Sequence, residues 1–314
     1  MKRNIGPTLA LMGLRQNRFS QVCLMEIMKR ILTRFESVTT LVSRSLLLVA
    51  TVATLCAVSV SPAQAKDLLY TTSGGGAEVF AIKVSGGKIS TTDIGPTHGG
   101  NCLSLALSPS GILFSMCGPL FGNQQLATID PKTGLANLFG VTVPGLSVMA
   151  MAFGPDGTLY AVGDCNRVGS ECTSTGDPNY NSLYTVDVTT GAFTRVGSTG
   201  APQFFMDLAF DGNGHMFGVT TTLNPSPVPA ILYRIDPATG AATKIVNLVG
   251  SNSVMGLAFG REGKLYATDF AQKPGLYLID IKTGFETAIA ALPFGFSSGL
   301  ELANPSLPES DGDQ

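Results

Sequence analysis

The most constraining feature of this sequence is a five-residue phrase that recurs at nearly regular intervals. It reads VFAIK, LATID, LYTVD, LYRID and LYLID, and a Thr-Gly pair follows each copy except the first, which leads into Gly-Gly. The copies occupy 79–83, 126–130, 183–187, 232–236 and 276–280. Internal repeats of this length indicate a fold built from similar units that stack or close into a ring.

A second phrase lies between these copies and completes the unit. It reads LSLALSPSG, AMAFGPDG, DLAFDGNG, GLAFGREG and GLELANPS, and a short apolar segment with an aromatic residue follows the first four. Apolar alternation, as at Leu208 and Phe210, predicts strands with one buried face. The intervening Gly, Asp, Asn and Pro suit tight turns. Each unit therefore contains four strands, which we call a, b, c and d.

The spacing of the units and the two ends of the repeat indicate a closed ring. The aromatic residue of strand b recurs at steps of 44 to 57 residues, as expected for propeller blades. The repeat begins with strand b at 67–72 and ends with strand a at 299–303, so the two ends complete one blade and remove its exposed edges. We predict an all-β, five-bladed β-propeller over residues 66–303, with four-stranded antiparallel blades.

The first 65 residues have the composition of an export signal. Arg44 precedes a mostly apolar run, 46–60, and the segment ends in Ala-Gln-Ala at Ala65. This order is typical of a signal peptide, and the apolar run is shorter than the ~20 residues of a membrane anchor. We expect cleavage after Ala65, or a true start at Met28 before it. The mature protein is then periplasmic or extracellular, with no membrane attachment.

The mature region is acidic. Residues 66–314 hold twelve Lys and Arg against twenty Asp and Glu, a net charge of −8, which repels phosphate backbones. We therefore expect no nucleic-acid partner, and we expect a monomer. Residues 304–314 are acidic and contain two prolines, which predicts a disordered tail.

Four cysteines remain in the mature chain. Cys102 and Cys117 lie on strands a and b of one hairpin, directly opposed in the register in which Leu107 faces Ile112. Two disulfides suit an oxidising compartment, and a metal site is the alternative. The predicted disulfides are Cys102–Cys117 and Cys165–Cys172.

The d-to-a and b-to-c loops of a propeller gather on one face around the central channel, and we call it the top face. The d-to-a loops are 95–101, 141–147, 198–204, 248–253 and 292–297, and the longest b-to-c loops are 164–181 and 221–230. Binding residues concentrate on loops held by a rigid scaffold. The candidate ligand-binding residues are His98, Asn101, Gln203, Asp207 and Asn252.

Asp207 is the most distinctive of these candidates. Its counterparts at the start of strand a are small and neutral: Ser104, Ala150, Gly256 and Gly299. With Asn101, Asn252 and Asp269 it offers oxygen ligands for Ca²⁺. The other interpretation is a solvated channel residue bonded to backbone amides, which is the commoner arrangement. The recurring Asp of the first phrase is predicted to accept hydrogen bonds from its Thr-Gly turn.

The phrases GLAFxxxGxLYA and LYxIDxxTGxxTxI resemble those of bacterial secreted propellers of the NHL-repeat, quinoprotein-like and gluconolactonase-like kinds. The resemblance spans about 67–303 and is specific for propeller repeats rather than for one family. Gluconolactonase-like enzymes have six blades and a channel Ca²⁺ held by carboxylate and amide side chains. The resemblance therefore implies Asp207, Asn101 and Asn252 as ligands here, although five blades depart from that pattern.

Two classes of function follow. The first is a non-catalytic binding or interaction module, with an unidentified small molecule or protein at the top face and no cofactor. The second is a Ca²⁺-dependent, lactonase-like hydrolase or lyase with its site in the central channel. No nucleophile paired with a histidine is visible in the sequence, so we predict no catalytic residues and favour the binding module. A sugar-binding lectin is a third class, which the absence of tryptophan disfavours.

Overall fold

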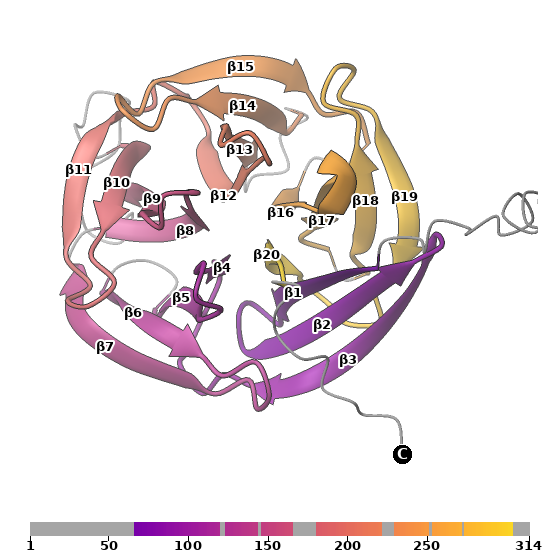
Figure 1. Ribbon diagram of the computed structural model, residues 1–314, viewed down its shortest axis with the longest axis horizontal. Coiled ribbons are helices and arrows are strands. Elements are labelled where there is room, and N and C mark those ends of the chain that lie inside the picture. The colour runs from indigo at the N-terminus through magenta and orange to yellow at the C-terminus, as the bar shows by residue number, and fades with distance from the viewer. Residues whose placement is uncertain are drawn as a thin grey trace, which may run out of the picture. The chain divides into compact units, whose positions relative to one another are not determined.

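The computed structural model describes residues 66–119, 123–143, 146–165, 180–221, 229–250, 253–271 and 273–303. Within them the strands form five four-stranded antiparallel sheets around a common centre (Figure 1), which confirms the predicted five-bladed propeller. The predicted signal peptide at 1–65, the predicted tail at 304–314, Asn252 and Cys172 lie outside these ranges. No helix in the described ranges is long and apolar enough to cross a membrane.

We number the blades in ring order, each written from its innermost to its outermost strand. Blade 1 contains β20 (Ser298–Leu302), β1 (Asp67–Ser73), β2 (Glu78–Ser85) and β3 (Lys88–Pro96). Blade 2 contains β4 (Ala106–Leu107), β5 (Leu113–Cys117), β6 (Gln124–Ile129) and β7 (Ala136–Val143). Blade 3 contains β8 (Leu146–Phe153), β9 (Leu159–Cys165), β10 (Ser182–Val186) and β11 (Phe193–Ser198).

Blade 4 contains β12 (Phe204–Phe210), β13 (Met216–Thr221), β14 (Ile231–Ile235) and β15 (Ala242–Asn247). Blade 5 contains β16 (Val254–Phe259), β17 (Leu265–Asp269), β18 (Gly275–Ile279) and β19 (Glu286–Ala291). The turn between β16 and β17 includes a single 3₁₀ turn, η1 (Arg261–Gly263).

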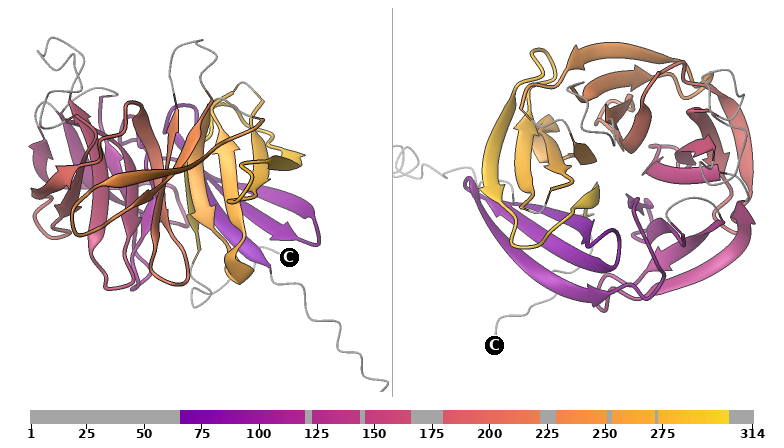
Figure 2. Two further views of the ribbon diagram at one scale, coloured as in Figure 1. Left: turned by 90° about the horizontal axis from the view of Figure 1, so that it is seen from above. Right: turned by 180° about the vertical axis from the view of Figure 1, so that it is seen from behind.

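The two ends of the repeat close the ring as predicted. Strand β20 pairs antiparallel with β1, with Leu69 opposite Leu302, and Figure 2 shows the two strands side by side. A second link joins blade 1 to blade 5. The buried carboxylate of Asp67 accepts hydrogen bonds from the Tyr266 hydroxyl at 2.8 Å and from the Arg261 N–H at 3.1 Å. Closure therefore leaves no unpaired innermost strand at either end.

The Thr-Gly turns join neighbouring blades. Gly240 has a left-handed φ of 81°, and a Cβ there would lie 2.7 Å from the carbonyl oxygen of Gly197 on the preceding blade. Only glycine permits this approach. The Asp of the phrase fixes the turn, as predicted: Asp187 Oδ1 accepts the Thr189 hydroxyl at 2.7 Å, the Thr189 N–H at 2.8 Å and the Thr190 N–H at 3.2 Å, and these bonds lower the pKa of Asp187 to about 2. The Asp and the Thr-Gly pair thus form a turn that packs against the preceding blade.

The Cys102–Cys117 disulfide is present, but the register that predicted it was one residue wrong. Leu107 pairs with Leu113 rather than with Ile112. Strand β4 is short because the Ser104 hydroxyl, rather than a backbone carbonyl, accepts the Met116 N–H at 3.2 Å. The innermost strands of the other blades also shift register by one residue at their top ends. The same irregularity in blade 2 brings the two cysteines together.

Replacing both Cys102 and Cys117 with alanine is expected to lower the free energy of unfolding by about 3 kcal/mol, because the bridge closes a loop of 15 residues in the unfolded chain. Urea unfolding followed by circular dichroism measures this loss. Reduction should cost the wild-type protein more stability than the double variant, because only the wild type has the Cys102–Cys117 bridge to lose. Equal stability of the wild type and the double variant would contradict the bridge.

Candidate functional site

The top ends of the innermost strands surround the centre of the ring, and we call this part of the top face the mouth (Figure 1). Each blade contributes one residue here. It lies four positions before the Leu or Met that begins LAL, MAF, LAF, LAF or LEL in the second repeated phrase. Three of these residues are polar and two are aromatic. They are Asn101, Ser147, Phe204, Ser253 and Phe296. The mouth is therefore amphipathic and differs from blade to blade, although the strands that carry it repeat.

Aromatic pairs hold both phenylalanines of the mouth. The ring of Phe296 lies 4.9 Å, centre to centre, from that of Phe270, which follows strand β17. The ring of Phe204 lies 5.8 Å from that of Tyr180, whose hydroxyl donates to the Pro202 carbonyl at 2.8 Å. Phe296 is nevertheless 38% exposed. These contacts fix the rings in place without burying Phe296.

Backbone strain gathers on the same face. Among the described residues, five non-glycine residues have a left-handed φ, and four of these lie in top-face loops: His98, Asn123, Asn181 and Phe296. The fifth, Glu262, lies in a turn on the opposite face. A left-handed φ is a true outlier for a residue as bulky as Phe296, whose φ is 56°. Strain of this kind is concentrated at functional sites in proteins generally.

Two buried polar atoms near the mouth have no hydrogen-bond partner in the described structure. The side chain of Gln124 is fully buried, and its Oε1 accepts the Val148 N–H at 2.7 Å, while its Nε2 is unpaired. The hydroxyl of Ser147, the residue before Val148, is also buried and unpaired. A buried donor or acceptor without a partner costs about 1–3 kcal/mol. An oxygen-bearing group from a ligand or an ordered water would satisfy them.

Asp207 lies at the centre of the ring with 0% exposure. Its Oδ2 accepts the N–H of Leu257 at 2.7 Å from blade 5 and that of Leu300 at 3.0 Å from blade 1. Its Oδ1 accepts the N–H of Leu208 at 3.0 Å. Burial raises the pKa of Asp207 well above its usual range, and Glu301 adds to this effect. The carboxylate thus ties three blades together through backbone amides, although it is buried rather than solvated.

Small residues make this arrangement of Asp207 possible. A Cβ on Gly299 would lie 2.8 Å from the carbonyl oxygen of Leu103 on the next blade, so the innermost strands approach closely at this level. Asp207 is the one large side chain among its ring of counterparts. A Ca²⁺ ion bound to Asp207 would have to replace the hydrogen bonds to Leu257 and Leu300.

The remaining candidates lie in separate surroundings. His98 is exposed on its loop, and the backbone of Asn101 pairs with that of Gly118. Gln203 Oε1 accepts the hydroxyl of Thr220 at 2.8 Å. Asp269 Oδ1 accepts the Gly275 N–H at 2.6 Å, and burial raises the pKa of Asp269. The described residues contain no group of three or more His, Cys, Asp or Glu side chains placed to hold a metal ion.

The mouth residues Phe296 and Ser147, and Gln124 on strand β6 beside them, were not among the candidate ligand-binding residues from the sequence. Alignment of the five repeats shows the mouth position, but it does not show which side chains there are exposed or unpaired. Strain at Phe296 and the unpaired atoms of Ser147 and Gln124 depend on loop geometry, for which the sequence has no motif.

A family model described as a repeat of unknown function, DUF6923, matches residues 71–293. The chain belongs to the DUF6923 repeat family. That match covers the blades described above from strand β1 to the end of strand β19. A comparison of this DUF6923 protein with curated protein sequences finds no match.

Solved structures with a similar fold have little sequence in common with the DUF6923 chain. A protein of unknown function from Bacteroides caccae is 14% identical, with a TM-score of 0.47 over 76% of this chain and all of the other. A gluconolactonase from Xanthomonas campestris is 13% identical, with a TM-score of 0.46 over 76% and 80%. TolB from Acinetobacter baumannii is 14% identical, with a TM-score of 0.42 over 72% of this chain, which spans only 54% of TolB.

Proposed function

We propose that this protein is an exported propeller that binds a small molecule or a protein at its mouth and catalyses no reaction. The observation that carries the proposal is Phe296. It is an exposed aromatic residue held at a left-handed φ on the inner rim of the ring. Strain of this kind costs about 1–3 kcal/mol, and more than a third of the Phe296 side chain remains exposed to solvent. A ligand that covers the ring would account for its position.

The chemistry of the mouth supports a ligand with both apolar and oxygen-bearing surfaces. Phe296 and Phe204 present aromatic surface, while the unpaired Gln124 Nε2 and Ser147 Oγ need hydrogen-bond partners. Export is supported by the Cys102–Cys117 disulfide, because such bonds persist in oxidising compartments. We place the mature protein in the periplasm or outside the cell.

A thermal-shift screen of sugars, lactones and metal ions tests the proposal. A ligand present at about 100 times its dissociation constant stabilises the native state by about 2.7 kcal/mol. Ligands of the mouth should raise the Tm of the wild type and of Phe285→Ala, but not that of Phe296→Ala. Phe285 is a suitable control because it is 58% exposed in the turn between the two outer strands β18 and β19 of blade 5, away from the innermost strands. Equal shifts in both variants would place binding elsewhere and refute the proposal.

The alternative function, a Ca²⁺-dependent hydrolase, predicts a different result in the same screen. Ca²⁺ should then raise the Tm of the wild type and fail to raise that of Asp207→Asn. The hydrogen bonds from Leu257 and Leu300 to Asp207 oppose this outcome, because ion binding would leave those buried amides without acceptors. We therefore expect Ca²⁺ to leave both proteins unchanged.

A further inference from the structure

Three methionines occupy the same position on the innermost strands of three neighbouring blades. They are Met149 on β8, Met206 on β12 and Met255 on β16, and each lies two residues after a mouth residue. Strand β12 lies between β8 and β16 in the ring and contacts both (Figure 1). The counterparts in blades 1 and 2 are Ser298 and Leu103. We call the three residues the methionine cluster.

Each residue of the methionine cluster is the extra residue of a β-bulge. In blade 3 the pairing passes from Val148 directly to Ala150, so Met149 has no partner on strand β9. Met206 and Met255 are skipped in the same way where β12 pairs with β13 and β16 pairs with β17. A bulge re-aims a side chain out of the regular alternation of its strand, and bulges are frequent beside functional sites. Three blades thus re-aim the same side chain at the same level of the ring.

The methionine cluster converges toward the centre of the ring. Met206 and Met255 are 1% and 2% exposed and belong to the apolar cluster that fills the gap between blades 4 and 5. Met149 belongs to blade 3, yet it packs against that same cluster. Its strand neighbours pack elsewhere, Val148 between blades 2 and 3 and Ala150 between blades 3 and 4. Met149 therefore extends toward the inner ends of blades 4 and 5, and it is half-buried, so solvent reaches the cluster through it.

We propose that the methionine cluster is a binding site for a soft monovalent cation, Cu(I). Soft thioether and thiolate ligands select Cu(I), whereas carboxylate and carbonyl oxygens suit hard ions such as Ca²⁺. Cu(I) has a filled d shell and no strong preference for one geometry, so a trigonal set of thioethers satisfies it. The flexible methionine side chain adjusts to such an ion. This site is separate from the ligand proposed for the mouth, because it uses the next layer of side chains along the innermost strands.

Packing alone does not account for methionine at these positions. Leu103 occupies the same position in blade 2 and is 2% exposed, so leucine also fills this layer of the ring. Methionine often fills irregular gaps in cores, as Met151 does between blades 2 and 3. Gap fillers of that kind occur at scattered positions, whereas the methionine cluster repeats one position in three neighbouring blades. A ligand shared by the three sulfur atoms would account for this repetition.

A buried cation needs an opposite charge nearby. Asp207 follows Met206 directly, and its carboxyl group can supply that charge while it still accepts the N–H groups of Leu257 and Leu300. The net charge of −8 on the mature region also favours a cation over an anion.

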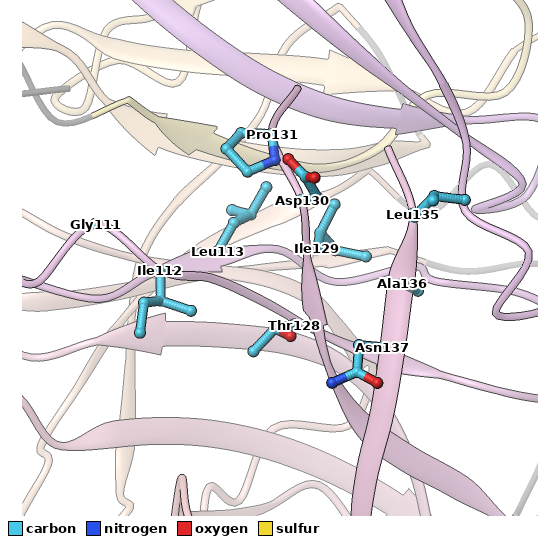
Figure 3. Close-up of a pocket in the computed structure, with 10 residues that line it drawn as sticks. All are labelled: Gly111, Ile112, Leu113, Thr128, Ile129, Asp130, Pro131, Leu135, Ala136 and Asn137. Atoms are coloured by element: carbon cyan, nitrogen blue, oxygen red, sulfur yellow. The ribbon is translucent and has the colours of Figure 1, made fainter. Parts of the chain in front are cut away.

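The cavity on blade 2 offers no comparable set of ligands. It has a volume of about 620 Å³, and Figure 3 shows Ile112 and Leu135 on either side of the end of strand β6. The described residues that line it include no Met, Cys or His. Its one carboxylate, Asp130, already accepts the Lys132 N–H at 2.8 Å. We therefore place the soft-metal site at the centre of the ring.

Competition with the Cu(I) chelator bicinchoninate, in oxygen-free buffer with ascorbate, tests the proposal on the protein expressed from its full-length sequence. Free thiols are first alkylated with iodoacetamide, because cysteine also binds Cu(I). Met149→Leu, Met206→Leu and Met255→Leu should each raise the dissociation constant at least about 10-fold, since even residues that only orient a metal ligand cost about 10–100-fold when replaced. Met151→Leu, on the same strand as Met149, should keep the wild-type affinity.

Two further readouts separate metal binding from packing. Leucine is close to methionine in volume, so all four variants should keep a Tm near the wild-type value without metal. In protein labelled with ¹³C at the methionine methyl groups, Ag(I), a redox-inert soft cation, should shift the resonances of Met149, Met206 and Met255. The resonance of Met151 should stay in place.

A wild type that binds no Cu(I) would overturn the proposal, and so would unchanged affinity in the three cluster variants or an equal loss in Met151→Leu. Displacement of Cu(I) by Ca²⁺ would overturn it as well, because thioethers do not select hard ions. Should a variant of the buried Met206 or Met255 fail to fold, the half-buried Met149 still provides the test. Phe296→Ala should keep Cu(I) binding, so failure of this site and failure of the ligand proposed for the mouth are distinguishable.

Discussion

Replacing Asp207 with leucine is expected to lower the free energy of unfolding by about 3–5 kcal/mol. The variant removes the acceptor of three buried N–H groups, and those of Leu257 and Leu300 belong to two other blades. Each amide left without a partner costs about 1–3 kcal/mol. Urea unfolding at a fixed pH gives the difference directly.

Two further variants distinguish the loss of the hydrogen bonds between blades from the loss of a carboxylate charge in general. Asp207→Asn retains one oxygen for Leu257 and Leu300 but sets an amide nitrogen against the Leu208 N–H, so its loss should lie between those of the wild type and Asp207→Leu. Asp236→Asn changes an exposed turn carboxylate and should alter stability little. If Asp207→Leu unfolds at the same urea concentration as the wild type, the carboxylate does not hold the blades together.

The sequence predicted the fold well because each blade repeats the same strand and turn patterns. The phrases set the strands, the Thr-Gly pairs set the turns, and the incomplete first and last units indicated closure of β20 on β1. The register in blade 2 was wrong by one residue at Leu107, because each innermost strand shifts its pairing by one residue towards its top end. The repeated phrases show where the strands lie but not where their pairing shifts.

The sequence was less informative about the centre of the ring. It singled out Asp207 by contrast with its small counterparts, but it did not show that Gly256 and Gly299 bring the innermost strands close enough for one carboxylate to reach two other blades. The sequence also did not show that Phe296 is exposed and has a left-handed φ. Its exposure and its left-handed φ arise from how loop 292–297 meets the preceding blade, where the Phe296 N–H donates to the Ala271 carbonyl at 2.8 Å.

Glu301 is expected to make the protein less stable as the pH rises. It stands where the other blades have a buried alanine, and its carboxylate accepts the N–H of Leu107 on blade 2 at 3.3 Å and that of Leu302 at 3.0 Å. Burial between the two blades raises the pKa of Glu301 from 4.5 to about 8. The two hydrogen bonds favour the ionised carboxylate, but they lower the pKa of Glu301 by less than burial raises it.

The sign of the effect follows from proton binding. Between pH 4.5 and about 8 the native state keeps the proton of Glu301 while the unfolded state has released it, so the free energy of unfolding falls as the pH rises through this window. Each unit of pKa difference corresponds to 1.36 kcal/mol, so the loss across the window is on the order of a few kcal/mol, reduced by the partial exposure of Glu301 to solvent. The raised pKa of Asp207 contributes in the same direction.

Urea unfolding of the wild type and of Glu301→Gln from pH 4.5 to 8 isolates the contribution of Glu301. Glutamine does not titrate, so the variant should lose less stability than the wild type as the pH rises, and it should be the more stable protein at pH 8. The slope that remains in Glu301→Gln includes the contributions of Asp207 and Asp269, whose pKa values burial also raises. Glu262→Gln, an exposed glutamate beside Lys264, should keep the wild-type slope. Parallel curves for the wild type and Glu301→Gln would show that Glu301 is ionised in the native state at neutral pH, with the gap between blades 1 and 2 open to water.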